Sequence, residues 1–92
     1  MDISVVIVSY NVREYIISCI QSIYKHSRGK INLEVIVIDN NSDDGSADFI
    51  NEKFPEVLLI KNDCNAGFSK AVNQGFKLTK GKYLFILNPD TL

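Results

Sequence analysis

Short apolar runs and helical stripes alternate along the whole chain. The apolar runs have the length and β-branched content of buried strands, and they lie at residues 3–8, 33–38, 57–60 and 82–87. Between them, apolar residues recur at helical spacing, which predicts helices over 12–27, 46–54 and 68–76. The order β-α-β-α-β-α-β predicts a three-layer α/β/α fold with a parallel sheet and right-handed crossovers.

Local signals mark where these elements begin and end. Asn11, followed three residues later by Glu14, has the pattern of a capping box at the start of the first helix. Gly29 suits a left-handed cap at its end, and Pro55 follows the second helix. Gly81 is expected to break the third helix before the last strand. With no linker, internal repeat or low-complexity segment, residues 1–92 are expected to form a single domain.

Composition excludes several classes of protein. Ninety-two residues with 46% apolar and 23% charged content suit one compact globular domain. Ten basic and eleven acidic residues give a net charge of −1, so a nucleic-acid-binding surface is not expected. No apolar run could span a membrane and no secretory signal is visible, which favours a cytoplasmic protein. Cys19 and Cys64 have no metal-binding or disulfide spacing.

Polar residues directly follow every predicted strand. In a parallel sheet these strand ends lie at one edge, and ligands bind where the strand order reverses. If the fourth strand pairs with the free side of the first, the reversal lies between them, and Asp39 and Asp90 flank the crevice. Asp90 follows the last strand, and a carboxylate there suits Mg²⁺ or Mn²⁺ together with a diphosphate. The residues expected at this edge are Ser9, Tyr10, Asn11, Asp39, Asn40, Asn62, Asp63, Asn88 and Asp90.

The polar segment 39–45 has two interpretations that the residues leave open. Asn, Asp, Ser and Gly form turns in any protein, and binding residues also concentrate on such loops. A calcium loop is excluded, because Gly45 comes one place late and Ile50 stands where a bidentate glutamate is required.

Other nucleotide and regulatory folds fit less well. A nicotinamide-binding domain needs glycines after the first strand, and residues 9–14 contain none. A phosphoacceptor regulatory domain would need paired acidic residues at the same place. A stand-alone nucleotide-binding module without transferase activity remains an alternative.

Four motifs, in this order and spacing, resemble the amino-terminal half of a family 2 glycosyltransferase with the GT-A fold, a Rossmann-like nucleotide-binding unit. They are Val-Ile-Val-Ser-Tyr-Asn at 6–11, Val-Ile-Val-Ile-Asp-Asn-Asn-Ser-Asp-Asp-Gly-Ser at 35–46, Asn-Ala-Gly-Phe-Ser-Lys-Ala-Val-Asn-Gln-Gly at 65–75, and Leu-Asn-Pro-Asp at 87–90. The last stands in the place of the family's DxD motif.

The resemblance implies a nucleotide-sugar site. Asp39 would contact the base, Asn88 the ribose and Asp90 the metal, which is Mg²⁺ or Mn²⁺. The residues expected to bind the nucleotide are Ser9, Tyr10, Asn11, Asp39, Asn40, Asn65, Gly67, Asn73 and Asn88.

One departure from the DxD motif bears on the expected sugar donor. Asn88 replaces the first aspartate of DxD, and its amide can bind a ribose hydroxyl without adding negative charge. Asn-Pro-Asp resembles the variant in bacterial rhamnosyltransferase-like members that build surface polysaccharide. The implied donor is a nucleotide-diphospho-sugar in which the sugar is linked to dTDP or UDP.

The resemblance also implies the reaction. The family's inverting members transfer a sugar to an acceptor hydroxyl, here of a saccharide or lipid-linked saccharide, and a metal neutralises the diphosphate. Their general base, an Asp or Glu, lies well beyond the DxD motif. We therefore expect residues 1–92 to be the donor half of an enzyme truncated after this motif, with no catalytic residue and no transfer activity of its own. The full-length enzyme would act at the inner face of the membrane.

The last predicted strand suggests self-association. Residues 83–87 are consecutively apolar, and Lys82 lies at the start of the strand rather than its middle. An unpaired apolar edge is a template for another strand. We therefore expect a homodimer in which residues 83–87 of two copies pair antiparallel about a two-fold axis.

Overall fold

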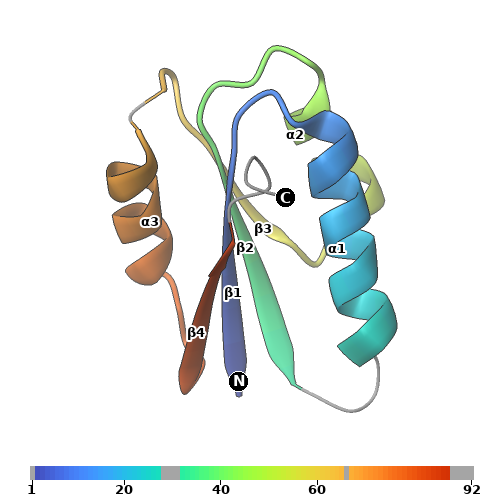
Figure 1. The fold of residues 1–92 in the computed structure, drawn as a ribbon, viewed down its shortest axis with the longest axis vertical. Helices are drawn as coiled ribbons and strands as arrows, with labels where there is room; N and C mark the ends of the chain where they lie inside the picture. The colour runs from blue at the N-terminus through green and yellow to red at the C-terminus, as the bar shows by residue number, and fades with distance from the viewer. Residues whose placement is uncertain (1, 28–31, 66, 88–92) are drawn as a thin grey trace.

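A computed structural model of the chain describes residues 2–27, 32–65 and 67–87, and it contains the seven elements expected from the sequence (Figure 1). In chain order they are β1 (Ile3–Ser9), α1 (Arg13–Ser27), β2 (Leu33–Asp39), α2 (Ser46–Lys53), β3 (Leu58–Lys61), α3 (Phe68–Phe76) and β4 (Tyr83–Leu87). The predicted element order is confirmed. The bounds of β1, β2 and β4 differ from prediction by one residue at one end, and those of β3 by one residue at both ends.

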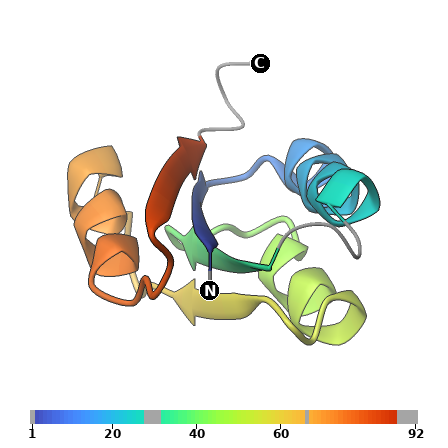
Figure 2. The same ribbon diagram turned by 90° about the horizontal axis from the view of Figure 1, so that it is seen from below.

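The four strands form one parallel sheet in the order β3-β2-β1-β4. Helices α1 and α2 cover one face of the sheet and α3 covers the other (Figure 2). The predicted three-layer α/β/α fold is therefore confirmed. Because β1 lies between β2 and β4, the strand order reverses between β1 and β4, as expected.

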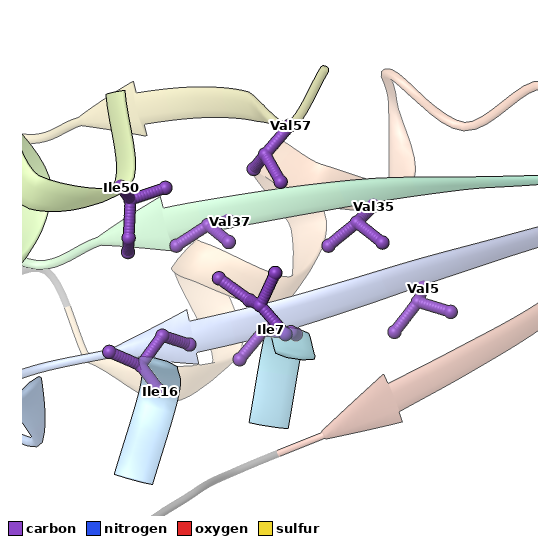
Figure 3. Packing of buried hydrophobic residues seen from close by; sticks show 8 residues of the cluster. Val5, Ile7, Ile16, Val35, Val37, Ile50 and Val57 are labelled. Atoms are coloured by element: carbon purple, nitrogen blue, oxygen red, sulfur yellow. The ribbon is translucent and has the colours of Figure 1, made fainter. Parts of the chain in front are cut away.

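The two central strands are buried on both faces. Successive residues of a strand point to opposite sides, so one set faces α1 and α2 and the other faces α3. Figure 3 shows the first set, in which Val5 and Ile7 of β1 lie beside Val35 and Val37 of β2. The second cluster consists of Val6, Val8, Ile36, Ile38 and Ala71. This double burial explains the uninterrupted apolar runs in β1 and β2.

Helix α3 approaches the sheet closely because it presents small residues. Ala71 is 0% exposed, and a Cβ added to Gly75 would lie 2.5 Å from Cγ1 of Val6. Gly81 is also sterically required, since its added Cβ would lie 2.7 Å from the backbone of Ile3 and Ser4. The helix itself already ends at Phe76, so Gly81 serves the close passage into β4 rather than the end of α3.

The capping box predicted for α1 is wrong. Asn11 has φ +50°, and its Oδ1 accepts a hydrogen bond from the Asp43 N–H at 2.8 Å. The N–H of Arg13, the first residue of α1, donates instead to Asp44 Oδ2 at 3.0 Å. The cap therefore comes from a distant loop. The predicted cap at Gly29 lies outside the described residues.

Two further expectations can be compared with the structure. Cys19 is partly buried, Cys64 is exposed, and both are free thiols, as expected. In the ranges that the structure describes, no helix combines the length and apolar character needed to cross a bilayer.

Candidate functional site at the carboxyl edge of the sheet

The loops that follow β1, β2 and β3 lie together at the carboxyl edge of the sheet, at the top of Figure 1. β4 ends at Leu87, which pairs with Ile7 next to the end of β1. The strand ends flanking the topological reversal therefore lie side by side. Asn88 and Asp90, predicted to bind ribose and metal, lie outside the described residues.

Ser9 and Asp39 are the buried polar pair of this edge. They are register partners in β1 and β2, and both are 0% exposed. Asp39 Oδ2 accepts a hydrogen bond from the Ser42 N–H at 3.0 Å. Asp39 Oδ1 and Ser9 Oγ have no hydrogen-bond partner within the described part of the chain. Ser46 Oγ, at the start of α2, is also buried without such a partner. Because buried polar atoms are nearly always paired, these oxygens leave hydrogen-bonding capacity at this edge that a ligand could use.

Asp44, which the sequence analysis did not single out, caps two helices with one carboxylate. Its Oδ2 accepts from the Arg13 N–H at the start of α1, and its Oδ1 accepts from the Ser46 N–H at the start of α2, both at 3.0 Å. Burial alone would raise the pKa of Asp44, but the hydrogen bonds from Ser46 and Arg13 outweigh it and lower the pKa. The N-cap residue of α2 is Gly45, which makes no side-chain cap bond, so the sequence position of Asp44 gave no standard capping signal.

Gly45 and Arg13 complete this double cap. Gly45 has φ +79°, a conformation that favours glycine, and an added Cβ would lie 2.9 Å from Arg13 Nη1. The same Nη1 donates to the Asp44 carbonyl at 3.0 Å, and the guanidinium carbon lies 5.2 Å from the centre of the Phe49 ring. The Asp-Gly-Ser part of the loop therefore holds the starts of α1 and α2 together.

The first loop is joined to the second through Asn11. Its N–H donates to Ser42 Oγ at 2.9 Å, while its side chain accepts from Asp43. The backbone N–H and the side-chain oxygen of Asn11 thus both bond to the loop after β2. Tyr10, one residue earlier, is 43% exposed, so its ring presents an aromatic surface at the edge.

Asn40 is also engaged within the protein. It is 2% exposed, its Nδ2 donates to the Gly67 carbonyl at 3.3 Å, and its Oδ1 accepts from Asn62 Nδ2 at 2.9 Å. Asn62 pairs in turn with Gln74 of α3, a residue that the sequence analysis did not identify. Direct contact of Asn40 with a nucleotide stays a prediction.

The segment before α3 has a defined turn. Asn65 Oδ1 accepts from the Gly67 N–H at 2.9 Å, and Gly67 has φ +88°. An added Cβ at Gly67 would meet nothing within 4 Å, so the glycine is required for its backbone conformation rather than for space. Both residues are exposed at the same end of the molecule as the other loops.

Asn73 lies apart from the Ser9–Asp39 pair. It is exposed on α3, on the face of the sheet opposite to α1 and α2 (Figure 2). There it lines an open groove of about 520 Å³ between α3 and the loop after β3. The residues lining this groove are Asn62, Asp63, Cys64, Lys70, Asn73, Gln74 and Lys77. The structure therefore does not bring Asn73 together with Asp39.

The described residues alone do not form a metal site. Within 2–27, 32–65 and 67–87, no group of three or more His, Cys, Asp or Glu side chains could hold a metal ion. A metal held by one protein carboxylate would take its remaining ligands from diphosphate oxygens and water. An ion held by Asp90, as predicted from the sequence, would therefore depend on the nucleotide for most of its ligands.

Comparison with known proteins gives one consistent result. The family model described as glycosyl transferase family 2 matches residues 4–92. The minor teichoic acid biosynthesis protein GgaB of Bacillus subtilis is 34% identical over 94 residues, which cover 99% of this chain and 10% of that protein. The Escherichia coli protein named UDP-Glc:alpha-D-GlcNAc-diphosphoundecaprenol beta-1,3-glucosyltransferase WfaP is 33% identical over 89 residues, covering 96% of this chain and 35% of that protein.

Solved structures share the fold. TarS residues 1–349 of S. aureus in complex with UDP-GlcNAc has a TM-score of 0.84 and 26% identity, with 98% of this chain and 27% of that chain covered. The mannosyltransferase PcManGT of Pyrobaculum calidifontis, in complex with GDP-Man and Mn²⁺, has a TM-score of 0.83 and 25% identity, with 96% and 27% covered. The chain thus spans between a tenth and about a third of the length of these proteins.

Proposed function

Because the chain belongs to glycosyl transferase family 2, we propose that its carboxyl edge binds the nucleoside diphosphate of a sugar nucleotide, as the donor site of an inverting glycosyltransferase. The observation that carries the proposal is the unpaired Asp39 Oδ1, buried beside the unpaired Ser9 Oγ at the reversal of strand order. An acceptor next to a hydroxyl complements a base that offers an N–H next to a carbonyl oxygen.

This pairing favours particular bases. Uracil and thymine both carry an imide N–H flanked by carbonyl oxygens, and guanine has a similar N–H and carbonyl pair. Cytosine presents an unprotonated ring nitrogen at that position, which an Asp39 carboxylate would repel. Since Ser9 and Asp39 are 0% exposed, the base reaches them only after neighbouring loop residues move aside. The exposed Tyr10 ring would stack on the base.

The remaining residues would hold the ribose, diphosphate and metal. Asn65 and Gly67 border the nucleotide, Asn88 binds the ribose, and Asp90 holds Mg²⁺ or Mn²⁺. The metal would neutralise the charge that develops on the diphosphate leaving group. Two complexes of similar proteins support a sugar-nucleotide donor and a divalent metal, one of TarS with UDP-GlcNAc and one of PcManGT with GDP-Man and Mn²⁺. We propose a UDP- or dTDP-linked sugar as donor, in keeping with the Asn-Pro-Asp sequence at 88–90.

The acceptor and assembly are proposed on separate grounds. The names of the relatives GgaB and WfaP support a saccharide or lipid-linked saccharide acceptor. The general base that activates its hydroxyl is not assigned to any residue between 1 and 92. In the described part of the sheet β4 pairs only with β1, so we also propose a homodimer through the free edge of Tyr83–Leu87.

Calorimetric titration of UDP, dTDP and CDP into the chain tests the base site. We expect UDP and dTDP to bind and CDP to bind much more weakly. Asp39→Ala should cost about 1–3 kcal/mol of UDP affinity, because a base donor is left unpaired. Asp43→Ala is the matched control, an exposed carboxylate in the same loop, and should bind UDP as the wild type does. Equal affinities of UDP and CDP, or an Asp39→Ala variant with unchanged affinity, would refute the assignment.

A further inference from the structure

A group of three side-chain amides connects the two strand ends next to the candidate site with helix α3. Asn62, directly after β3, lies at its centre. Its Nδ2 donates to Asn40 Oδ1 and to Gln74 Oε1, and its Oδ1 accepts from Gln74 Nε2, each at 2.9 Å. Asn62 thus uses both amide hydrogens and pairs reciprocally with Gln74. We call Asn40, Asn62 and Gln74 the amide cluster.

The backbone of the cluster is attached to the Ser9–Asp39 pair. The Asn40 N–H donates to the Ser9 carbonyl, and the Asn62 N–H donates to the Asp39 carbonyl, both at 2.8 Å. A displacement of Asn40 or Asn62 would therefore also displace the backbone of Ser9 and Asp39, whose side chains carry the two unpaired oxygens. One end of the cluster belongs structurally to the base site.

The other end of the cluster holds the start of α3. Asn40 Nδ2 donates to the Gly67 carbonyl at 3.3 Å, and the same carbonyl accepts from the Ala71 N–H at 3.2 Å, in the first turn of the helix. Gln74 attaches the helix a second time, further along its length. Gly67 and the start of α3 are therefore fixed relative to the strand ends by directional bonds.

Apolar packing alone would orient this segment poorly. Where α3 meets the sheet, its fully buried residues are Ala71 and Gly75, which have almost no side chain to interlock with β1 and β2, and Val72 packs there as a partly buried side chain. Contacts between small residues allow a close approach but resist sliding and rotation only weakly. A fully hydrogen-bonded polar network fixes one orientation of the helix on the sheet. Apolar groups of similar shape could stabilise the fold as much, but they would not fix that orientation.

We propose that Asn62 and Gln74 are positioning residues that preform the nucleotide site. They hold Gly67 at a set place relative to the backbone of Ser9 and Asp39, so that this wall of the site is in place before the ligand arrives, and only the loop residues that cover Ser9 and Asp39 have to move. Binding then requires less ordering of the protein, which increases affinity. This inference rests on the proposed function, which identifies the ligand. The role of Asn62 and Gln74 in placing Gly67 does not depend on it.

Substitutions at Gln74 test the proposal with UDP as the probe. Gln74→Met keeps the length of the side chain and removes both of its hydrogen bonds to Asn62, and we expect about tenfold weaker UDP binding, because a less firmly placed Gly67 has to be ordered when the ligand binds. Gln74→Glu keeps an acceptor for Asn62 Nδ2 and should restore part of the affinity. Lys77→Ala, at the C-cap of the same helix but outside the amide cluster, should bind as the wild type does. Circular dichroism and thermal unfolding confirm that each variant is folded.

A second measurement separates positioning from general stability. Hydrogen exchange of the Ala71 N–H, which is bonded to the Gly67 carbonyl, should become several-fold faster in Gln74→Met than in Lys77→Ala, while amides of β1 and β2 exchange as in the wild type. Uniformly faster exchange across the sheet would show that Gln74 only stabilises the fold, and it would overturn the proposal.

The two readouts also separate this inference from the proposed function. If the wild type binds UDP and Gln74→Met binds it equally well, the positioning role is refuted while the nucleotide site stands. If the wild type does not bind UDP, the proposed function fails, and the Ala71 exchange rate alone decides. Faster exchange confined to that end of α3 supports the positioning role, and unchanged exchange overturns it.

Discussion

Two carboxylates, one at the end of β2 and one in the loop that follows it, have different surroundings and therefore different expected roles. Asp44 has both side-chain oxygens paired with helix N–H groups, at 3.0 Å each. Asp39 has one oxygen paired and one buried without a partner in the described residues. An unpaired buried acceptor is costly unless a ligand satisfies it, whereas a fully paired carboxylate stabilises the fold. We therefore expect Asp39 to bind a ligand and Asp44 to cap the helices.

The first residue-scale prediction concerns Asp44. Asp44→Ala should lower the free energy of unfolding by about 1–4 kcal/mol, because two helix caps are lost at about 0.5–2 kcal/mol each. Urea denaturation of the variant, with Asp43→Ala as control, measures the difference. A loss no larger than that of Asp43→Ala would contradict the double cap.

The same residue predicts a pH dependence. Hydrogen bonds lower the pKa of Asp44 in the folded protein below its ordinary value of 3.8. Its contribution is therefore fully present above the unfolded pKa and is lost as the pH falls through the lower folded pKa. The difference in stability between wild type and Asp44→Ala should shrink below about pH 4. A difference that persists undiminished at pH 2 would argue against the charged cap.

Asp90 carries the prediction about metal. Mn²⁺ should raise the affinity of the wild-type chain for UDP, because the ion would bridge the carboxylate and the diphosphate. Asp90→Asn should abolish this gain and leave metal-free binding nearly intact. Titrations with and without Mn²⁺ measure both effects, and Asp63→Asn, in the loop after β3, serves as the control. A variant that keeps the full Mn²⁺ effect would remove Asp90 from the metal site.

At the scale of elements, the distance between α3 and β1 is set by one glycine. Gly75→Ala would bring a methyl group to 2.5 Å from Val6 Cγ1, so the helix must move away from the sheet. We expect a loss of about 1–3 kcal/mol in the free energy of unfolding, as for other overpacked cores. Gly75→Ala combined with Val6→Ala should recover part of it in the same denaturation experiment, since the second substitution makes room. No recovery would show that the cause is not this contact.

Helix starts at this scale depend on partners from other loops. The Arg13 N–H of α1 is capped by a carboxylate 31 positions further along the chain, and α3 begins at a carbonyl held by Asn40, 27 positions earlier. The double cap and the amide cluster are thus formed by different loops of the same edge. Together they join α1, α2 and α3 to the strand ends around the candidate site.

At the scale of the whole molecule, the free edge of β4 carries exposed apolar side chains. Tyr83 is 67% exposed, Phe85 54% and Ile86 43%, and in the described sheet β4 has a partner on one side only. Exposed apolar surface next to unpaired backbone groups favours pairing with another strand. Two copies related by a two-fold axis would cover both edges at once.

The last prediction is that the chain dimerises through this edge. Sedimentation at micromolar concentration should show a dimer for the wild type and a monomer for Phe85→Lys. Tyr15→Lys is the matched control, because Tyr15 is 57% exposed on α1, away from β4, and its substitution should leave the dimer intact. A monomeric wild type, or a dimer that survives Phe85→Lys, would rule out pairing through Tyr83–Leu87.

The sequence by itself determined the elements, their order and the edge at which polar residues gather. Apolar runs such as Ile3–Val8 and the helical stripes are local patterns, and burial on both faces follows from their length and periodicity. The position of Asp39 at the carboxyl end of a strand follows equally from this pattern. The pairing of β4 with β1, which puts the reversal of strand order beside β1, was a condition in the sequence analysis, and the structure supplies it.

Only the tertiary structure decided which polar groups are paired and which are left for a ligand. Asn11 has the sequence pattern of a helix cap but joins two loops, and the cap comes from Asp44. Asn40 and Asp39 are adjacent in sequence, yet the amide of Asn40 is used by Asn62 and Gly67 while Asp39 keeps an unpaired oxygen. The physical reason is that a hydrogen bond depends on distance and direction between atoms, and partners tens of residues apart acquire these only when the sheet and helices are packed.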